Sequence, residues 1–315
     1  MLSYRHGYHA GNTGDVLKHL VLSALLRAAR RKTTPLCYVE THAGAGVYDL
    51  TDSFALRNRE YETGIGALWQ RLGEDGCGAQ VGDNDVVREA VRRHHLPTLL
   101  ADYRAAIVQL NADPSLAAVA GAAGSNTIAP LRYYPGSPSL ARHWLDASDP
   151  MWLAELHPAD YQQLTELFAS RAAAHVRKTD GYQLLKSVLP AGERRAVVLI
   201  DPAYERDGEQ ARIVGAVANL LQRMRHAVCA IWAPLRGKVD AEQLAQEITA
   251  LRPDQLLRVT LRADDDRVLG SSMLVVNPPF RIDVELREAM AWLVLALPHS
   301  RVDVSWLIGA SAPAP

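Results

Sequence analysis

The strongest constraint on the fold is an order that repeats along the chain: a short apolar run, a polar or glycine-rich turn, then an amphipathic segment. Runs that have the length and residue types of buried strands lie at 36–41, 152–156, 196–201 and 229–234, with a strand and turn at 174–182. Helical patterns separate most of these runs. This alternation predicts an α/β fold with a mostly parallel sheet, and the runs near 256–261 and 272–277 predict a closing pair of strands.

In parallel α/β sheets, ligands bind where the strands reach their carboxyl ends. Here those positions are rich in Gly, Asp, Glu and His, in the segments ETHAGAG (40–46), ELHP (155–158), TDG (179–181) and DPAY (201–204). A functional site needs such residues, whereas a bare turn does not. We therefore expect the chemistry along this edge of the sheet.

Three of these segments are candidates for binding a nucleotide-like ligand. Gly44 and Gly46 would let the backbone approach a ligand closely, but the third glycine of the dinucleotide fingerprint is absent, so a plain tight turn is the alternative. Glu155 can accept hydrogen bonds from two ribose hydroxyls, or it is a surface carboxylate before a helix. Asp180 could bind an adenine amine, with Gly181 admitting the ring, or it caps the next helix.

Two segments share the order apolar run, Asp or Asn, proline, aromatic: AVVLIDPAYE (196–205) and SMLVVNPPF (272–280). Both resemble the (Asp/Asn)-Pro-Pro-(Tyr/Phe) signature of amino-group methyltransferases. In the sheet of those enzymes the chemistry lies at the tip of the fourth strand, and 196–201 is fourth in order here. The run 272–277 is seventh, where the strand is antiparallel and ends at the other edge. We therefore expect Asp201 in the active site and Asn277 in a structural turn.

Amine methylation gives a reason for Asp201, Pro202 and Tyr204. A carboxylate and a rigid backbone carbonyl can accept the two hydrogens of an amine and aim its lone pair at a methyl donor. Asp201 can also take the proton, and Tyr204 offers a flat face for stacking a base. No metal is required. The alternative is that Asp201 caps the following helix and Tyr204 only packs.

Composition excludes some classes of function. With a net charge of -1 over 315 residues, the protein is not a globally basic nucleic-acid binder, so RNA contact needs a local basic face. One candidate face is in the N-terminal region, at Arg5, Lys18, Arg27, Arg30, Arg31 and Lys32, and another is 92–95. The alternative for the N-terminal residues is a solvated helix face.

Other features point to a soluble cytoplasmic protein. Cysteines 37, 77 and 229 lack metal-like spacing and indicate reduced thiols. The apolar run 289–298 is too short to span a bilayer. His6, His9 and His19 match no usual zinc spacing, so we expect no metal. Few apolar stripes are left unpaired, which favours a monomer without membrane contact.

Six motifs in order carry a resemblance to one family. They are MLSYRHGYHAGNTGDVLKH at the N-terminus, ETHAGAG, RYYPGSP, ELHP, KTDG and LIDPAYE. Together they resemble the RlmJ family, bacterial enzymes that methylate the exocyclic amine of an adenine in 23S ribosomal RNA with S-adenosylmethionine. The resemblance implies a Rossmann-like methyltransferase sheet with an antiparallel last strand. It also implies a methyltransferase domain of 1–53 and 131–315, and a helical insertion of 54–130 after the first strand.

The resemblance also assigns roles to residues. It implies cofactor contacts at His19, His42, Ser137, Glu155, Asp180 and Gly181, next to the glycine loop with Gly44 and Gly46. It implies Asp201 as the catalytic carboxylate, and Tyr4, His6 and Lys18 as an arm that faces the substrate RNA. The chain departs from the motif at Ala203, where a second proline is expected, and this affects rate rather than reaction type. The implied substrate is protein-free or early-assembly 23S RNA.

Three alternatives remain open from the sequence. The Asp-Pro-x-Tyr chemistry is shared with DNA adenine and protein-glutamine methyltransferases. A non-catalytic RNA-binding factor in ribosome assembly would not need Asp201 at all. A nucleotide-binding dehydrogenase is disfavoured because the third glycine and a hydride-transfer site are missing.

Overall fold

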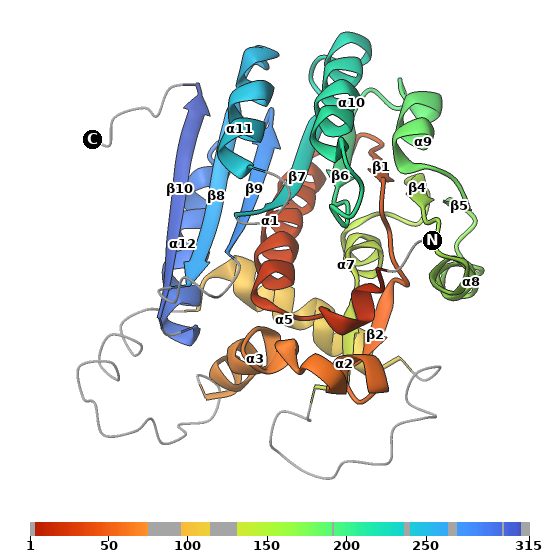
Figure 1. The fold of residues 1–315 in the computed structure, drawn as a ribbon. Helices are drawn as coiled ribbons and strands as arrows, with labels where there is room; N and C mark the ends of the chain where they lie inside the picture. Colours follow the sequence, from red (N-terminus) through yellow and green to blue (C-terminus); the bar gives the residue numbers. More distant parts are fainter. Residues whose placement is uncertain are drawn as a thin grey trace.

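The computed structural model describes residues 4–74, 96–113, 131–190, 192–235, 240–263, 270–297 and 299–309. One eight-stranded sheet runs through the molecule in the order β10-β8-β9-β7-β6-β1-β4-β5 (Figure 1). Its strands are β1 (Cys37–Glu40), β4 (Met151–Ala154), β5 (Ala174–Arg177), β6 (Ala196–Ile200), β7 (Val228–Pro234), β8 (Leu256–Ala263), β9 (Ser271–Val276) and β10 (Ser300–Ile308). A small antiparallel sheet pairs β2 (Val47–Asp49) with β3 (Tyr133–Pro135).

The strand directions confirm the predicted α/β class. Strands β5, β4, β1, β6 and β7 are mutually parallel. Strand β9 is antiparallel to β7, and Cys229 of β7 lies opposite Val276 of β9. Strand β9 therefore ends beside the start of β7. Strand β6 is the fourth of the large sheet in chain order and β9 the seventh, as the sequence predicts.

Strand β10 is the main element that the sequence analysis did not predict. It pairs antiparallel with β8 over most of its length and forms one edge of the sheet. Its residues Arg301, Val302, Asp303 and Val304 alternate polar and apolar, and only Val304 of these is buried. In an edge strand with one exposed face few residues are buried, so the alternation of polar and apolar residues is weak and the strand is hard to predict. The apolar run before it forms helix α12 (Ile282–Ala296).

Helices cover both faces of the sheet. On one face lie α1 (Thr13–Arg30), α7 (Ser137–Trp144) and α12, and on the other α9 (Gly181–Val188), α10 (Glu209–Arg223) and α11 (Ala241–Ala250). Helix α8 (Pro158–Leu167) packs beside β5. Side chains of β1 alternate between the two layers, because successive residues of a strand point to opposite faces: Tyr38 belongs to the first and Val39 to the second.

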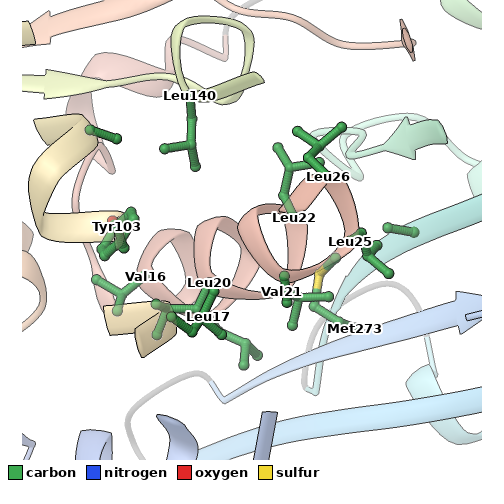
Figure 2. Packing of buried hydrophobic residues seen from close by; sticks show 14 of the residues in the cluster. Val16, Leu17, Leu20, Val21, Leu22, Leu25, Leu26, Tyr103, Leu140 and Met273 are labelled. Carbon is green, nitrogen blue, oxygen red and sulfur yellow. The ribbon is translucent and has the colours of Figure 1, made fainter. Parts of the chain in front are cut away.

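Helix α1 is the centre of the larger core. It is capped by Asn12, whose side chain accepts a hydrogen bond from the Asp15 backbone N–H. Its apolar residues point in several directions, toward Tyr103, Leu140 and Met273 of three other elements (Figure 2). Burial on all sides explains why the leucines of this segment are spaced more densely than a single amphipathic stripe requires.

The predicted insertion is described only in part. Its described elements are α2 (Ser53–Asn58), the 3-10 turn η2 (Glu60–Glu62), α3 (Ile65–Glu74) and α5 (Thr98–Asn111), and α2, α3 and α5 gather at one end of the sheet (Figure 1). Buried residues such as Leu68 and Tyr103 join the same core as α1. A separate subdomain of 54–130 stays a prediction. The candidate basic segment 92–95 lies outside the described residues.

Candidate active site

A cavity lies where the parallel strands reach their carboxyl ends. It is lined by almost every residue that the sequence analysis selected: Tyr4, His6, Lys18, His19, His42, Gly44, Ser137, Glu155, Asp180, Gly181, Asp201, Pro202 and Tyr204. These residues come from the arm, from α1 and from the turns after β1, β3, β4, β5 and β6. The fold therefore brings together side chains that are up to 200 positions apart.

Gly46 is the exception among the predicted cofactor residues, because it does not line this cavity. Its φ is +80°, and a Cβ there would lie 2.8 Å from both Leu164 and Leu167 of α8. Its carbonyl accepts hydrogen bonds from the backbone of Gly136 and the hydroxyl of Ser139. Gly46 thus allows a close packing of the glycine loop against α8, and the structure does not support a direct contact with a cofactor.

Glu155 presents its carboxylate at the end of β4. One oxygen accepts the backbone N–H of Gly44 at 2.8 Å and the other that of His157 at 2.6 Å. Burial raises the pKa of Glu155, and these backbone hydrogen bonds favour its charged form. Each oxygen can accept a second hydrogen bond. The group is therefore placed to receive ligand hydroxyls while the loop holds it in position.

Asp180 is the N-cap of α9, which was the alternative from the sequence. Its Oδ1 accepts the backbone N–H groups of Tyr182 and Gln183, and its Oδ2 accepts from the guanidinium of Arg212. Burial opposes its charge, but these bonds hold the pKa of Asp180 below its usual value. A Cβ on Gly181 would lie 1.9 Å from the carbonyl oxygen of Thr41, so only glycine permits this contact between α9 and the turn that follows β1.

His19 is the clearest sign that the cavity accommodates a polar ligand. The residue is 1% exposed and stacks on Tyr134 with ring centroids 5.2 Å apart, and among the described residues neither ring nitrogen has a hydrogen-bond partner. Burial lowers its pKa to about 3, so the ring is neutral at pH 7. An unsatisfied buried polar group of this kind is costly in a native structure and indicates a partner that binds in the cavity.

His42 and Ser137 also face the cavity with polar groups. The Thr41 hydroxyl lies 2.8 Å from Nδ1 of His42, and burial lowers the pKa of His42 to about 4. Ser137 donates its hydroxyl to the carboxyl of Glu40. Glu40 is fully buried beneath the cavity, and burial raises its pKa to about 8.

Asp201 follows β6 and is held from the side of α1. Lys18 Nζ lies 2.6 Å from Asp201 Oδ2 and 2.7 Å from Asp15 Oδ1. Burial disfavours the ammonium, but the two carboxylates outweigh it and raise the pKa of Lys18 well above its usual value. The sequence analysis placed Lys18 on the arm and Asp201 in the catalytic motif. The structure joins them directly.

The N-terminal arm lies over this cluster. His6 Nε2 is 2.8 Å from Asp15 Oδ2, and the Tyr4 hydroxyl is 2.8 Å from His6 Nδ1. The arm is fixed on two sides. Arg5 pairs with Asp160 of α8 at 3.1 Å, and His9 contacts Glu60 of η2 at 3.0 Å.

Tyr204 is more enclosed than a free stacking platform. It has a positive φ of 55°, is 7% exposed, and donates its hydroxyl to the backbone carbonyl of Trp232. Ala203 beside it is exposed. Tyr204 therefore packs, as the alternative from the sequence proposed, and its ring also forms part of the cavity wall.

A second, wider cavity of about 890 Å³ lies on the other side of Asp201. The residues that line both cavities are Tyr4, His6, Lys18, Asp201, Pro202, Ala203 and Tyr204. The far wall is apolar and aromatic, with Trp232, Pro234 and Leu261. The wall near the arm is polar, with His9, Asn12 and Glu60. Asp201 thus lies at the boundary of two compartments.

Asn277, in the competing motif, is at the other edge of the sheet. It follows β9 and has a positive φ of 49°. Its amide donates to the carbonyls of Arg225 and Ala227, and its oxygen accepts the backbone N–H of Asp254 at 3.2 Å. These contacts tie three turns together.

Three arginines that were candidates for phosphate contact, Arg27 and Arg30 near the end of α1 and its C-cap Arg31, line neither cavity. The helix begins beside Asp201 but runs back along the sheet, so its last turn lies far from the cavities. Arg27 pairs with Asp102 at 2.9 Å, Arg30 with Asp149 at 3.1 Å, and Arg31 with Glu285 at 3.1 Å. Proximity in sequence to Lys18 was therefore misleading, because eighteen helical residues span about 27 Å.

Within the described ranges, no group of three or more His, Cys, Asp or Glu side chains is placed to hold a metal ion. His6, His9 and His19 are directed to three different partners, Asp15, Glu60 and the ring of Tyr134. Among these same described residues, no helix has both the length and the apolar character needed to cross a bilayer.

Comparison with known proteins identifies the family. The model of the family described as "Ribosomal RNA large subunit methyltransferase D, RlmJ" matches residues 33–308. The chain belongs to the RlmJ family. Ribosomal RNA large subunit methyltransferase J of Escherichia coli (strain K12) is 33% identical over 315 residues, covering 98% of this chain and 99% of that protein. The Haemophilus influenzae protein of the same name is 32% identical over 301 residues, covering 94% of each.

A solved structure agrees with this assignment. The crystal structure of a Legionella pneumophila protein aligns with a TM-score of 0.76 and 29% identity, over 96% of this chain and 99% of that one. The predicted resemblance to RlmJ and the predicted fold class are confirmed, and the chain is a methyltransferase. The roles of individual residues stay predictions.

Sequence analysis missed several residues of the RlmJ site. Asp15 was not selected as a site residue, although the spacing of Asp15 and Lys18 puts both on one helical face. Arg206 and Arg212 line the first cavity from the segment after the motif and had no local signal. His157 also lines it; this histidine belongs to the candidate segment ELHP (155–158) but was given no role.

Proposed function

We propose that this protein transfers a methyl group from S-adenosylmethionine to the exocyclic N6 amine of an adenine in 23S ribosomal RNA. The observation that carries the proposal is the position of Asp201 on the wall shared by two cavities. Group transfer between two bound molecules requires such a boundary, because donor and acceptor must meet at the reacting atoms. The names of the E. coli and H. influenzae relatives support the RNA substrate.

The first cavity fits S-adenosylmethionine. Glu155 would accept the ribose hydroxyls, Gly44 and Gly181 would lie against the ligand, and His19 would gain the partner that its ring nitrogens lack. His42 and Ser137 would complete the polar wall, and Asp180 would share its carboxylate between Arg212 and an adenine amine. When bound, the cofactor supplies an electrophilic methyl group on a sulfonium sulfur.

The residues around Asp201 would prepare the acceptor. The amine of adenine is a weak nucleophile because its lone pair is delocalised into the ring. Asp201 and the backbone carbonyl of Pro202 would accept its two hydrogens and direct the lone pair toward the first cavity. Asp201 would then take the proton released by the amine. Tyr204 would contact the base with the part of its ring that lines both cavities.

The second cavity is of the size that ligand sites have, and its apolar wall suits an unstacked base. A base inside a duplex cannot reach Asp201, so the target adenine would be splayed out of its strand. We propose that the substrate is therefore RNA that is free of protein or at an early stage of assembly. We further propose a monomeric enzyme that acts in the cytoplasm, consistent with the buried free thiols of Cys37 and Cys229.

The test is methyl transfer from labelled S-adenosylmethionine to protein-free 23S RNA. Wild type is compared with Asp201→Ala and with Asn277→Gly, which keeps the left-handed backbone at the other edge of the sheet. We expect transfer to be lost in the first variant and kept in the second. Parallel reactions offer duplex DNA and a glutamine-containing protein. Transfer to either of these, with none to RNA, would replace the RNA substrate by that one.

A further inference from the structure

We propose that Asp15 is a positioning residue, which orients the catalytic carboxylate of Asp201 through Lys18. The proposal rests on the proposed function, since it assumes that Asp201 receives the acceptor amine. Asp15 lines the second cavity but not the first. Its effect is therefore expected on the acceptor side of the reaction and not on cofactor binding.

Asp15 is buried and uses both carboxylate oxygens. It is 4% exposed. Oδ1 accepts from Lys18 Nζ at 2.7 Å, and Oδ2 accepts from the Gly11 backbone N–H at 3.0 Å and lies 2.8 Å from His6 Nε2. Burial opposes its charge, yet His6 and Lys18 hold the pKa of Asp15 well below its usual value. Its orientation is thus determined by three groups from the arm, the loop and α1.

Lys18 transmits that orientation to Asp201. A lysine side chain is a flexible four-carbon stem, so one ion pair alone would allow the ammonium to occupy several positions. Bonds of 2.7 Å to Asp15 and 2.6 Å to Asp201 fix it between the two carboxylates. Lys18 binds Oδ2 of Asp201, and no hydrogen bond to Oδ1 is found from the described residues. Oδ1 is therefore the oxygen available to an amine.

Charge gives Asp15 a second role. Asp15 and Asp201 share one ammonium, which leaves the three-residue cluster with one net negative charge. Without the charge of Asp15, Lys18 would pair with Asp201 alone and neutralise it. A neutralised carboxylate accepts hydrogen bonds from an amine less strongly. Asp15 thus preserves the strength of Asp201 as a hydrogen-bond acceptor and also maintains the orientation of the Asp201 carboxylate.

The competing interpretation is that Asp15 only stabilises the start of α1. It is the third residue of the helix, and its bond to Gly11 N–H resembles a capping contact. A capping residue acts on stability, so its replacement lowers the fraction of folded protein but leaves the turnover of folded enzyme unchanged. The positioning role predicts that the effect of Asp15 on kcat depends on the presence of Lys18, whereas a capping role does not. This dependence separates the two interpretations.

The experiment is a double-mutant cycle of Asp15→Asn and Lys18→Met, measured as kcat and KM for 23S RNA per folded enzyme. We expect Asp15→Asn to lower kcat about 100-fold, and Lys18→Met at least as much. Because both act through one contact, the double variant should be no slower than Lys18→Met alone. The Kd for S-adenosylmethionine should change less than threefold. Asp240→Ala, which removes the side-chain cap of α11 at a residue that lines neither cavity, is the control for loss of a helix cap.

Two results would overturn the positioning role. One is a kcat of Asp15→Asn within threefold of wild type. The other is a double variant whose fold-decrease in kcat equals the product of the decreases in the two single variants. Where Asp15→Asn does not fold, Asp15→Glu displaces the carboxylate by one methylene and enters the same cycle. If wild type methylates DNA or protein but not RNA, the proposed substrate fails, and the cycle measured on that acceptor still decides the role of Asp15.

Discussion

Lys18 Nζ lies 2.6 Å from Asp201 Oδ2, although the two residues are 183 positions apart. Lys18 is 4% exposed, so this ion pair is shielded from water. It ties the first helix to the tip of the fourth strand, and it places the arm, the proposed catalytic carboxylate and both cavities in one connected unit.

Removal of the ammonium should therefore affect stability as well as transfer. Lys18→Met leaves the buried carboxylate of Asp15 and the mostly buried carboxylate of Asp201 without the ammonium that they share. Breaking a buried pair in this way costs about 3–5 kcal/mol. We expect that decrease in the free energy of unfolding, measured with urea, together with loss of methyl transfer. Lys186→Met, on the exposed side of α9, should change the free energy by less than about 0.5 kcal/mol. Equal unfolding free energies of the two variants would contradict a stabilising role of the ion pair between Lys18 and Asp201.

His19 should oppose stability but favour cofactor binding. Its two ring nitrogens have no hydrogen-bond partner in the part of the chain that the structure describes, so His19→Leu removes an unsatisfied buried group and is expected to stabilise the free protein by about 1 kcal/mol. The same change should weaken binding of S-adenosylmethionine at least tenfold. Thermal unfolding and calorimetric titration measure the two effects. His226→Leu, at a histidine whose side chain is 88% exposed, is the control and should alter neither. Unchanged affinity of His19→Leu would remove His19 from the cofactor site.

Glu40 should make stability depend on pH. Burial raises its pKa to about 8 in the folded protein, whereas an unfolded glutamate titrates near its ordinary value of about 4.3. Between these values the folded state binds the extra proton. Stability should therefore fall as pH rises, by up to about 1.4 kcal/mol per pH unit.

Glu40→Gln keeps the shape and removes this titration. We expect its unfolding free energy to be flatter between pH 5 and 8 than that of wild type, and higher at pH 8, measured by urea unfolding at a series of pH values. The hydrogen-bond partners Tyr38 and Ser137 remain in both proteins. Parallel pH profiles of the two proteins would show that Glu40 is charged throughout.

Gly181 should tolerate no side chain. A Cβ there would lie 1.9 Å from the Thr41 carbonyl oxygen, so Gly181→Ala must displace the start of α9 from β1. We expect a loss of about 2 kcal/mol or more in urea unfolding, and weaker cofactor binding. The matched control is Gly215→Ala in the exposed middle of α10, where a Cβ meets nothing within 4 Å. That change should stabilise by about 0.5–1 kcal/mol. A neutral Gly181→Ala would show that α9 can shift without loss.

Much of this protein could be predicted from its sequence, because its determinants are local. Period-two and helical patterns locate the strands and helices, and their order places DPAY at the tip of the fourth strand and Asn277 at the end of the seventh. The carboxyl ends of parallel strands share one edge, so the candidates Glu155, Asp180 and Asp201 could be grouped without coordinates.

Only the tertiary structure decided which of these groups meet and which partners they already have. The path of α1 brings Lys18 to Asp201 but carries Arg30 to the opposite edge, and no local pattern contains that direction. Asp180 caps α9, Gly46 packs on α8, and His19 has no hydrogen-bond partner among the described residues, because such contacts depend on segments distant in sequence. Periodicity determines which face of an element is buried, whereas the partner of a buried polar atom depends on how all the elements pack.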